Sequence, residues 1–285
     1  MRLRLTLLTD NGALLPFNYQ YPLSAAVYKI IQRADRNFAA FLHNRGYGEG
    51  QKSFKLFTFS DIRTPFVRCG DRMQLTTGEA ELTVCFYLPV AAEHFIRGLF
   101  MHQQLEIADR ASKVVLTVVG IENLPSVISS NSPTLLQPLS PLVVGRKNER
   151  GHYDYRSPED ADFGECLYYN WMEKCAAVGL PVAMGREEPE VNIDVQFYNH
   201  PPQQRLITIK GGTDAETRIR GYTKFWLEVC APLEMLEMAL GAGLGLHNAQ
   251  GMGCVGIINK TTNIDNHRKH EALLKTNRNK RVDSL

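Results

Sequence analysis

The sequence GAGLGLHNAQGMGCVG spans residues 241–256 and places six glycines within sixteen positions. A predicted helix from Pro232 to about Leu240 precedes it, and its last residues enter a predicted strand, Met252 to Asn259. Glycine loses more conformational entropy on folding than any other residue. Such a cluster therefore indicates close approach of the backbone to another group, or several turns with positive φ.

Two familiar glycine motifs do not fit this segment. A dinucleotide-binding fingerprint follows a strand and opens a helix, whereas this segment follows a helix and opens a strand. A phosphate-binding loop ends in Gly-Lys-Ser or Gly-Lys-Thr, and neither follows here. Two interpretations stay open: a helix C-cap with a tight connection into the strand, or a loop that packs beside an RNA backbone.

Outward from this segment, the hydrophobic pattern predicts the same order of elements twice. In the first half, alternation and helical spacing predict strands at 2–7, 53–60, 72–77, 81–88, 104–109 and 113–121, and helices at 23–31, 35–42 and 90–101. In the second half they predict strands at 136–146, 191–198, 206–210, 218–230 and 252–259, and helices at 157–178 and 232–240. Pro138 and Pro141 place the strand at 136–146 toward a sheet edge. Each half reads βαββαβ.

This order predicts an α+β protein of two tandem ferredoxin-like domains with a cleft between them. We expect an N-terminal domain at 1–125, which would carry catalytic residues, and a C-terminal domain with the glycine-rich loop at 126–260. A linker rich in Ser, Pro and Asn at 123–132 would join them, and 261–285 would form a basic, flexible tail.

Composition narrows the class of protein. The net charge of +2 at pH 7 does not by itself indicate a nucleic-acid partner. No CxxC pair or Cys/His cluster has the spacing of a zinc site, so we expect the cysteines to be mostly buried thiols. The apolar stretch 229–246 carries Glu234 and Glu237, which makes it a poor membrane span. We expect a cytoplasmic protein that needs no cofactor or metal and contacts no membrane.

Several motifs together resemble one family. The glycine spacing in GLGLHNAQGMG at 243–253, the run PFNYQYPL at 16–23, FLH at 41–43 and KLFTFS at 55–60 are similar to the CRISPR-associated Cas6 endoribonucleases, within the repeat-associated RNA-binding superfamily. The resemblance covers nearly the whole chain except the tail. It implies repeat-RNA cleavage without a metal, in which the 2′-hydroxyl attacks the adjacent phosphate and leaves a 2′,3′-cyclic phosphate and a 5′-hydroxyl.

The resemblance also implies the catalytic residues. His43 would exchange protons, because imidazole does so near neutral pH better than other side chains. Tyr28 would orient the 2′-oxygen or donate a proton, although on helical spacing alone it could be core. Lys55 would stabilise charge at the phosphate, with Lys52 close enough to take its place. Without the resemblance, a histidine after an apolar pair would be read as structural.

RNA-binding candidates follow from the glycine segment and from cations on predicted strands. They are Gly243, Gly245, Gly251, Gly253, His247, Asn248, Arg2, Arg4, Arg146, Lys147, Lys210, Arg218, Arg220 and Lys224. The alternative for each cation is a solvated sheet face. Trp171 and Trp226 are predicted to be core residues.

Two rival functions stay open. The first is a non-catalytic RNA-binding subunit of a CRISPR effector complex on the same fold. The second is a small-molecule enzyme whose glycine loop holds a nucleotide. The sequence does not tell which RNA is bound, whether the RNA is a hairpin, or whether the protein forms a homodimer or joins other effector subunits.

Overall fold

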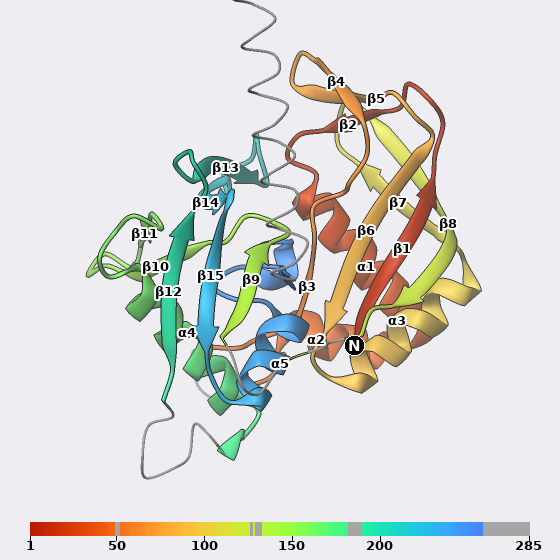
Figure 1. The fold of residues 1–285 in the computed structure, drawn as a ribbon. Helices are drawn as coiled ribbons and strands as arrows, with labels where there is room; N and C mark the ends of the chain where they lie inside the picture. The colour runs from red at the N-terminus through yellow and green to blue at the C-terminus, as the bar shows by residue number, and fades with distance from the viewer. Residues whose placement is uncertain (49–51, 126–127, 129–132, 182–189, 259–285) are drawn as a thin grey trace, which may run out of the picture.

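Two antiparallel sheets with the same internal strand order form the centre of the protein (Figure 1). The computed structural model describes residues 1–48, 52–125, 128, 133–181 and 190–258. The first sheet runs β3-β6-β1-β8-β7 and the second β12-β15-β9-β16. With β7 set aside as an extra edge strand, both follow the order 2-3-1-4 within a βαββαβ unit. The predicted ferredoxin-like fold class is confirmed.

The first half contains three helices and eight strands among its described residues. They are β1 (Arg2–Leu8), β2 (Leu14–Pro16), α1 (Gln20–Ala34), α2 (Arg36–Asn44), β3 (Phe57–Phe59), β4 (Phe66–Cys69), β5 (Arg72–Leu75), β6 (Glu79–Phe86), α3 (Pro89–Met101), β7 (Gln104–Ala108) and β8 (Lys113–Asn123).

The second half follows in the same way. Its elements are β9 (Thr134–Pro138), β10 (Val144–Lys147), β11 (Tyr153–Arg156), α4 (Phe163–Ala177), β12 (Asn192–Phe197), β13 (Gln203–Ile209), β14 (Thr217–Thr223), β15 (Phe225–Cys230), α5 (Leu233–Ala242), the short 3₁₀ helix η2 (Asn248–Gln250) and β16 (Val255–Ile257).

The local signals of the first half produce the expected elements. In β1 the alternating residues Leu3, Leu5 and Leu7 are buried in the core beneath the helices. The Asp35 carboxylate accepts a hydrogen bond from the Phe38 amide at 2.8 Å and so caps α2. Pro89 occupies the first turn of α3, where its missing N–H costs nothing. These residues fix where α2 and α3 begin.

The second half has a core of its own, around Trp171, Phe163 and Phe225, all fully buried. The prediction that Trp171 is a core residue is confirmed. Trp226 is only half-buried and packs edge-on against Tyr198, with ring centroids 4.6 Å apart. Four of the six cysteines are buried and all six are free thiols, as expected, while Cys69 and Cys230 are exposed.

Several predicted boundaries were wrong. The stretch 136–146 is not one strand: β9 ends at Pro138, and β10 pairs with β11 in a separate two-stranded sheet. β9 is also interior rather than at an edge. Pro138 is tolerated there because it is the last residue of the strand, where the ladder ends.

Other segments belong to small separate sheets. The stretch 218–230 divides into β14 and β15 at Lys224, whose φ of +64° turns the chain, and β14 pairs with β13 outside the main sheet. The predicted strand at 72–77 joins β2 and β4 instead of the central sheet. The helix predicted from 157 begins only at Phe163, because the Asp160 carboxylate accepts from the Ser157 amide and holds a turn before it.

The two halves meet along a bonded seam. The Thr58 hydroxyl of β3 donates to the Met252 carbonyl at 3.0 Å, and the Asp61 amide donates to the Leu139 carbonyl at 2.8 Å. This seam brings the glycine-rich segment, residues 241–256, against β3 and α1. The predicted tail at 261–285 and most of the linker at 123–132 lie outside the described residues. None of the helices in the described part of the chain is long and apolar enough to cross a membrane.

Candidate active site

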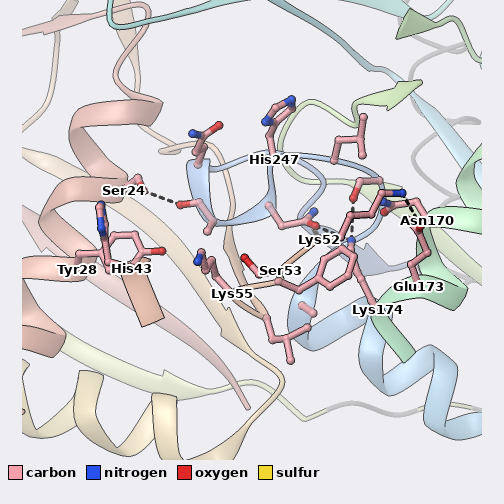
Figure 2. Close-up of a pocket in the computed structure, with 18 of the residues that line it drawn as sticks. Ser24, Tyr28, His43, Lys52, Ser53, Lys55, Asn170, Glu173, Lys174 and His247 are labelled. Carbon is pink, nitrogen blue, oxygen red and sulfur yellow. Dashed lines mark hydrogen bonds and ion pairs between the residues drawn. The ribbon is translucent and has the colours of Figure 1, made fainter. Parts of the chain in front are cut away.

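An open cavity of about 1450 Å³ lies on the helical side of the seam, between α1 and α2 of the first half and α4 of the second. The segment before β3, strand β10 and the loop after α5 complete its lining. Figure 2 shows Tyr28 and His43 on one side of the cavity and Asn170, Glu173 and Lys174 on the other. The seam therefore brings side chains more than a hundred residues apart in sequence into one site.

Tyr28 and His43 form the first wall. Their rings meet edge to face with centroids 5.2 Å apart, and the other side of Tyr28 packs against Phe57 at 5.4 Å. His43 occupies the last turn of α2. It is exposed, and its Nδ1 lies 3.0 Å from Oδ1 of Asn44. Burial raises the pKa of the Tyr28 hydroxyl well above its usual range, which keeps it protonated as a donor.

The two candidate lysines have different surroundings. The Lys52 ammonium forms an ion pair with Glu173 of α4 and lies over the Tyr169 ring, 5.7 Å from its centroid. Lys55 has no such partner among the described residues, and partial burial lowers its pKa. A cation without a carboxylate partner is free to interact with an incoming phosphate.

Gly46 explains how Lys55 reaches this wall. A Cβ at Gly46 would lie 2.9 Å from Cδ and 3.1 Å from Nζ of Lys55, and its φ is +70°. Paired backbone hydrogen bonds between Tyr47 and Phe54, at 2.8 and 2.7 Å, close the loop that follows. The long connection between His43 and Lys55 therefore returns to its starting point, and the Lys55 ammonium lies beside the end of α2.

The clustered glycines are explained by packing within the protein. A Cβ at Gly251 would lie 2.2 Å from the Phe59 ring, and one at Gly245 would lie 2.2 Å from the Val143 carbonyl oxygen. Gly243 and Gly253 each leave room for the Asn248 amide, which a Cβ would approach to 2.7 Å. All four have positive φ. Only Gly245 of the four lines the cavity, so what faces it is mainly the stretch 245–250, which we call the loop tip.

The side-chain amide of Asn248 forms its hydrogen bonds with other residues of the protein. Its Nδ2 donates to the carbonyls of Leu244 at 2.8 Å and Met252 at 3.1 Å, and its Oδ1 accepts from Lys174 at 2.5 Å. Both amide hydrogens are therefore engaged within the protein, which favours a structural role for Asn248. His247 lines the cavity with φ +60°, and its Nε2 is buried without a hydrogen-bond partner among the described residues. Burial lowers the pKa of His247, which makes it a neutral hydrogen-bonding group rather than a cation.

Sequence reasoning missed Lys174, which is 1% exposed and whose ammonium contacts three oxygens of the glycine-rich segment. Burial lowers its pKa to about 7. A signal was present, because position 174 follows Leu167 and Trp171 at helical spacing on the apolar face of α4. A lysine on such a face must find oxygen partners inside the protein.

The predicted RNA-binding cations fall into three groups. Arg146 and Lys147 on β10 line the cavity, the former paired with Glu165 at 2.6 Å and the latter 5.7 Å from the Tyr153 ring centroid. Arg2 and Arg4 instead line a separate pocket of about 350 Å³, together with Arg63. The remaining four surround the β13–β14 hairpin and do not line the cavity: Lys210, Arg218, Arg220 and Lys224.

Comparison with known proteins decides the family. The sequence model described as CRISPR-associated protein Cas6, N-terminal, matches residues 14–117, and the one described as CRISPR associated protein Cas6, C-terminal, matches residues 123–257. Together these stretches cover more than half of the chain. The chain belongs to the Cas6 family. The sequence-based recognition of this family is confirmed.

Individual Cas6 proteins are similar along almost the full length. A relative from Methanocaldococcus jannaschii, CRISPR-associated endoribonuclease Cas6 1, is 25% identical over 97% of this chain and 98% of its own. A solved structure titled CRISPR associated protein Cas6 is 25% identical, with a TM-score of 0.67 over 91% of this chain and 99% of that one. The fold alone is shared with a Cas6-related protein from Pyrococcus furiosus, 18% identical, with a TM-score of 0.73 over 91% of this chain and 99% of that one.

Proposed function

We propose that this protein is an endoribonuclease that cleaves CRISPR precursor RNA within its repeats to give guide RNAs. One observation carries the proposal: Tyr28, His43 and Lys55 line a single open cavity that is also lined by the cations Arg146 and Lys147. Membership of the Cas6 family and the similarity to a protein named as an endoribonuclease support it. We place the protein in the cytoplasm.

The proposed reaction uses a nucleophile that the RNA provides. The 2′-hydroxyl next to the scissile phosphate attacks the phosphorus, and the bond to the 5′-oxygen of the next nucleotide breaks. The products are a 2′,3′-cyclic phosphate and a 5′-hydroxyl. The protein must therefore accept one proton, donate one proton and stabilise the extra negative charge of the phosphorane.

The side chains divide these tasks according to their surroundings. His43 is exposed at the end of α2, where it accepts the proton of the attacking 2′-hydroxyl and then donates it to the leaving 5′-oxygen. Tyr28 stays protonated, so it orients the 2′-oxygen as a hydrogen-bond donor and does not act as a base. Lys55, which lacks a carboxylate partner in the described part of the chain, is the cation at the phosphate, whereas Lys52 is held by Glu173.

We further propose that residues 1–125 and 126–260 are the two domains, with the reacting groups on the first and the glycine-rich loop on the second. Each of these parts has its own hydrophobic core. RNA would enter between the wall of α1 and α2 and the loop tip. Arg146 and Lys147 are positioned to meet its phosphates. The repeat RNA is the partner that this arrangement requires.

The direct test is incubation with the repeat RNA of the associated CRISPR locus in excess EDTA. We expect one cut within each repeat and a 2′,3′-cyclic phosphate end, identified by mass spectrometry. A single 2′-deoxy substitution at the scissile nucleotide should abolish that cut without weakening binding. Tight binding with no cleavage would instead support the rival function, a non-catalytic subunit of an effector complex.

A further inference from the structure

The amino group of Lys174 is buried beneath the glycine-rich segment. Lys174 of α4 donates to the carbonyl oxygens of Gly243 and Gly245, both at 2.8 Å, and to Oδ1 of Asn248 at 2.5 Å. An ammonium group has three N–H donors, so these contacts use all of them. The neighbouring carboxylate, Glu173, is committed to Lys52. Lys174 therefore has no N–H donor left to contact a substrate directly.

The partners of Lys174 all belong to one turn of chain at the end of α5. Gly243 is the C-cap of that helix, where unpaired carbonyls and the helix dipole favour a nearby cation. Asn248 connects Lys174 to the rest of the loop, because its Nδ2 donates to the carbonyls of Leu244 and Met252 on the two sides of the loop. The ammonium and this amide together tie both sides of the loop to α4.

The opposite side of the loop is tied to the other wall. The Ser24 hydroxyl of α1 donates to the Ala249 carbonyl at 2.6 Å, and the contact is drawn in Figure 2. Ser24 lies four residues before Tyr28, so both side chains project from the same face of α1. The loop tip, 245–250, is thus held between Lys174 on one wall and the helix that carries Tyr28 on the other.

We infer that Lys174 is a positioning residue of this ribonuclease: through the glycine-rich loop and its contact with Ser24, it sets the place of the loop tip relative to Tyr28 and His43. The inference rests on the proposed function. Removal of the ammonium leaves three oxygens unpaired beneath the loop, and the loop tip then shifts relative to the reacting groups. A misplacement of about 1 Å far from the chemistry can cost on the order of 100-fold in rate.

The test compares Lys174→Met with Cys175→Ala, a control at the next buried position of α4, which does not line the cavity. Single-turnover cleavage of repeat RNA is measured with the enzyme in increasing excess. A loss of folded protein alone shifts the half-saturating concentration and leaves the saturating rate unchanged. We expect Lys174→Met to lower the saturating rate about tenfold or more, and Cys175→Ala to leave it unchanged.

If the Lys174→Met protein does not fold, two further variants still test the positioning role of Lys174. Lys174→Arg retains the charge and several donors and should recover part of the saturating rate. Asn248→Ala removes the side-chain acceptor from a half-exposed position and should lower the rate in the same way. Hydrogen exchange of the Leu246 amide, which bonds the Val143 carbonyl at 2.8 Å, should quicken in both loss variants.

The outcomes separate the two proposals. If the unaltered protein never cuts the repeat RNA, the proposed function fails whatever Lys174 does. If the unaltered protein cuts, and both Lys174→Met and Asn248→Ala retain its saturating rate, the positioning role of Lys174 is overturned. Equally fast exchange of the Leu246 amide in all variants would overturn that role as well.

Discussion

The two walls of the cavity differ in how their polar groups are used. On the wall of α1 and α2, His43 is exposed and Lys55 has no carboxylate partner among the described residues. On the opposite wall, Lys174 and Asn248 have used their hydrogen-bond donors within the protein. One wall keeps groups free for chemistry, and the other uses its groups to hold a shape. Substitutions on each wall test this contrast.

The largest effect should come from His43→Ala. Loss of a general acid or base typically lowers the rate about 10²- to 10⁴-fold. The exposed ring makes few packing contacts, so RNA affinity and stability should hardly change. Parallel cleavage and filter-binding assays measure the two quantities. A variant that cleaves at the original rate would show that His43 takes no part in the reaction.

The packing that holds the glycine-rich segment against β3 is disrupted by Gly251→Ala. The new Cβ would collide with the Phe59 ring. The alanine would also have to adopt the left-handed backbone conformation of Gly251. Strain and overpacking together should lower the free energy of unfolding by about 2–4 kcal/mol. Gly70→Ala is the matched control, because Gly70 has φ +61° but nothing within 4 Å of its would-be Cβ. Urea unfolding compares them, and equal losses would show that the packing against Phe59 has no cost.

Lys55 and Lys52 present the same contrast within three residues of sequence. We expect Lys55→Ala to lower the cleavage rate about 10- to 100-fold, because it removes a charge at the phosphate. Lys52→Ala should change it only a few-fold, since that ammonium is already held by Glu173. Single-turnover rates at saturating enzyme decide between them. The reverse order would assign the cation at the phosphate to Lys52.

The burial of Lys174 should appear in the dependence of stability on pH. Its folded pKa is lowered to about 7, below the usual 10.5, so the unfolded chain binds more protons between these values. The cost of burying the charge is fully present below pH 7 and is relieved as pH rises. From pH 7 to 9, the unaltered protein should gain up to a few kcal/mol of stability relative to Lys174→Met. Urea unfolding at several pH values measures this difference, and parallel curves would contradict it.

Among the three proposed reacting residues, the smallest effect should come from Tyr28→Phe, which keeps the ring against His43 and Phe57 and removes only the hydroxyl. The rate should fall about tenfold, as for the loss of one hydrogen bond worth roughly 1.5 kcal/mol. Because burial raises the pKa of this hydroxyl, it does not ionise in the assay range. The pH–rate profile should therefore become lower and keep its shape. Loss of an alkaline limb would show that the tyrosine acts as a base.

Local sequence signals predicted most elements of the first half, because each depends on neighbours along the chain, but they missed the short strands β2 and β4. The alternation in β1 and the cap at Asp35 are examples of such signals. The failures came where an apolar run continues through a turn, as at Lys224, or where a strand pairs outside the main sheet, as β5 does. Sheet membership depends on distant partners, which hydrophobic periodicity does not record.

The candidate site shows the same limit. His43, Tyr28 and the two lysines were singled out through the family resemblance; their own patterns would have left the first two as structural residues and the lysines as surface residues. Lys174 was missed because a charged residue in a helix is usually solvated. Only its spacing from Leu167 and Trp171 indicated burial. Spacing cannot identify the oxygens that accept hydrogen bonds from its ammonium group.

The order of strands and helices, and the positions where only glycine fits, were set by the sequence alone, because these follow from backbone conformation and local periodicity. Which charged groups are free and which are paired was settled by tertiary packing. Lys52 meets Glu173 across 121 residues of chain, and Lys174 meets Gly245 across 71. The first contact forms only when the two halves pack along the seam, and the second only when α4 packs beside the end of α5, because a hydrogen bond requires its atoms to lie within about 3 Å of one another.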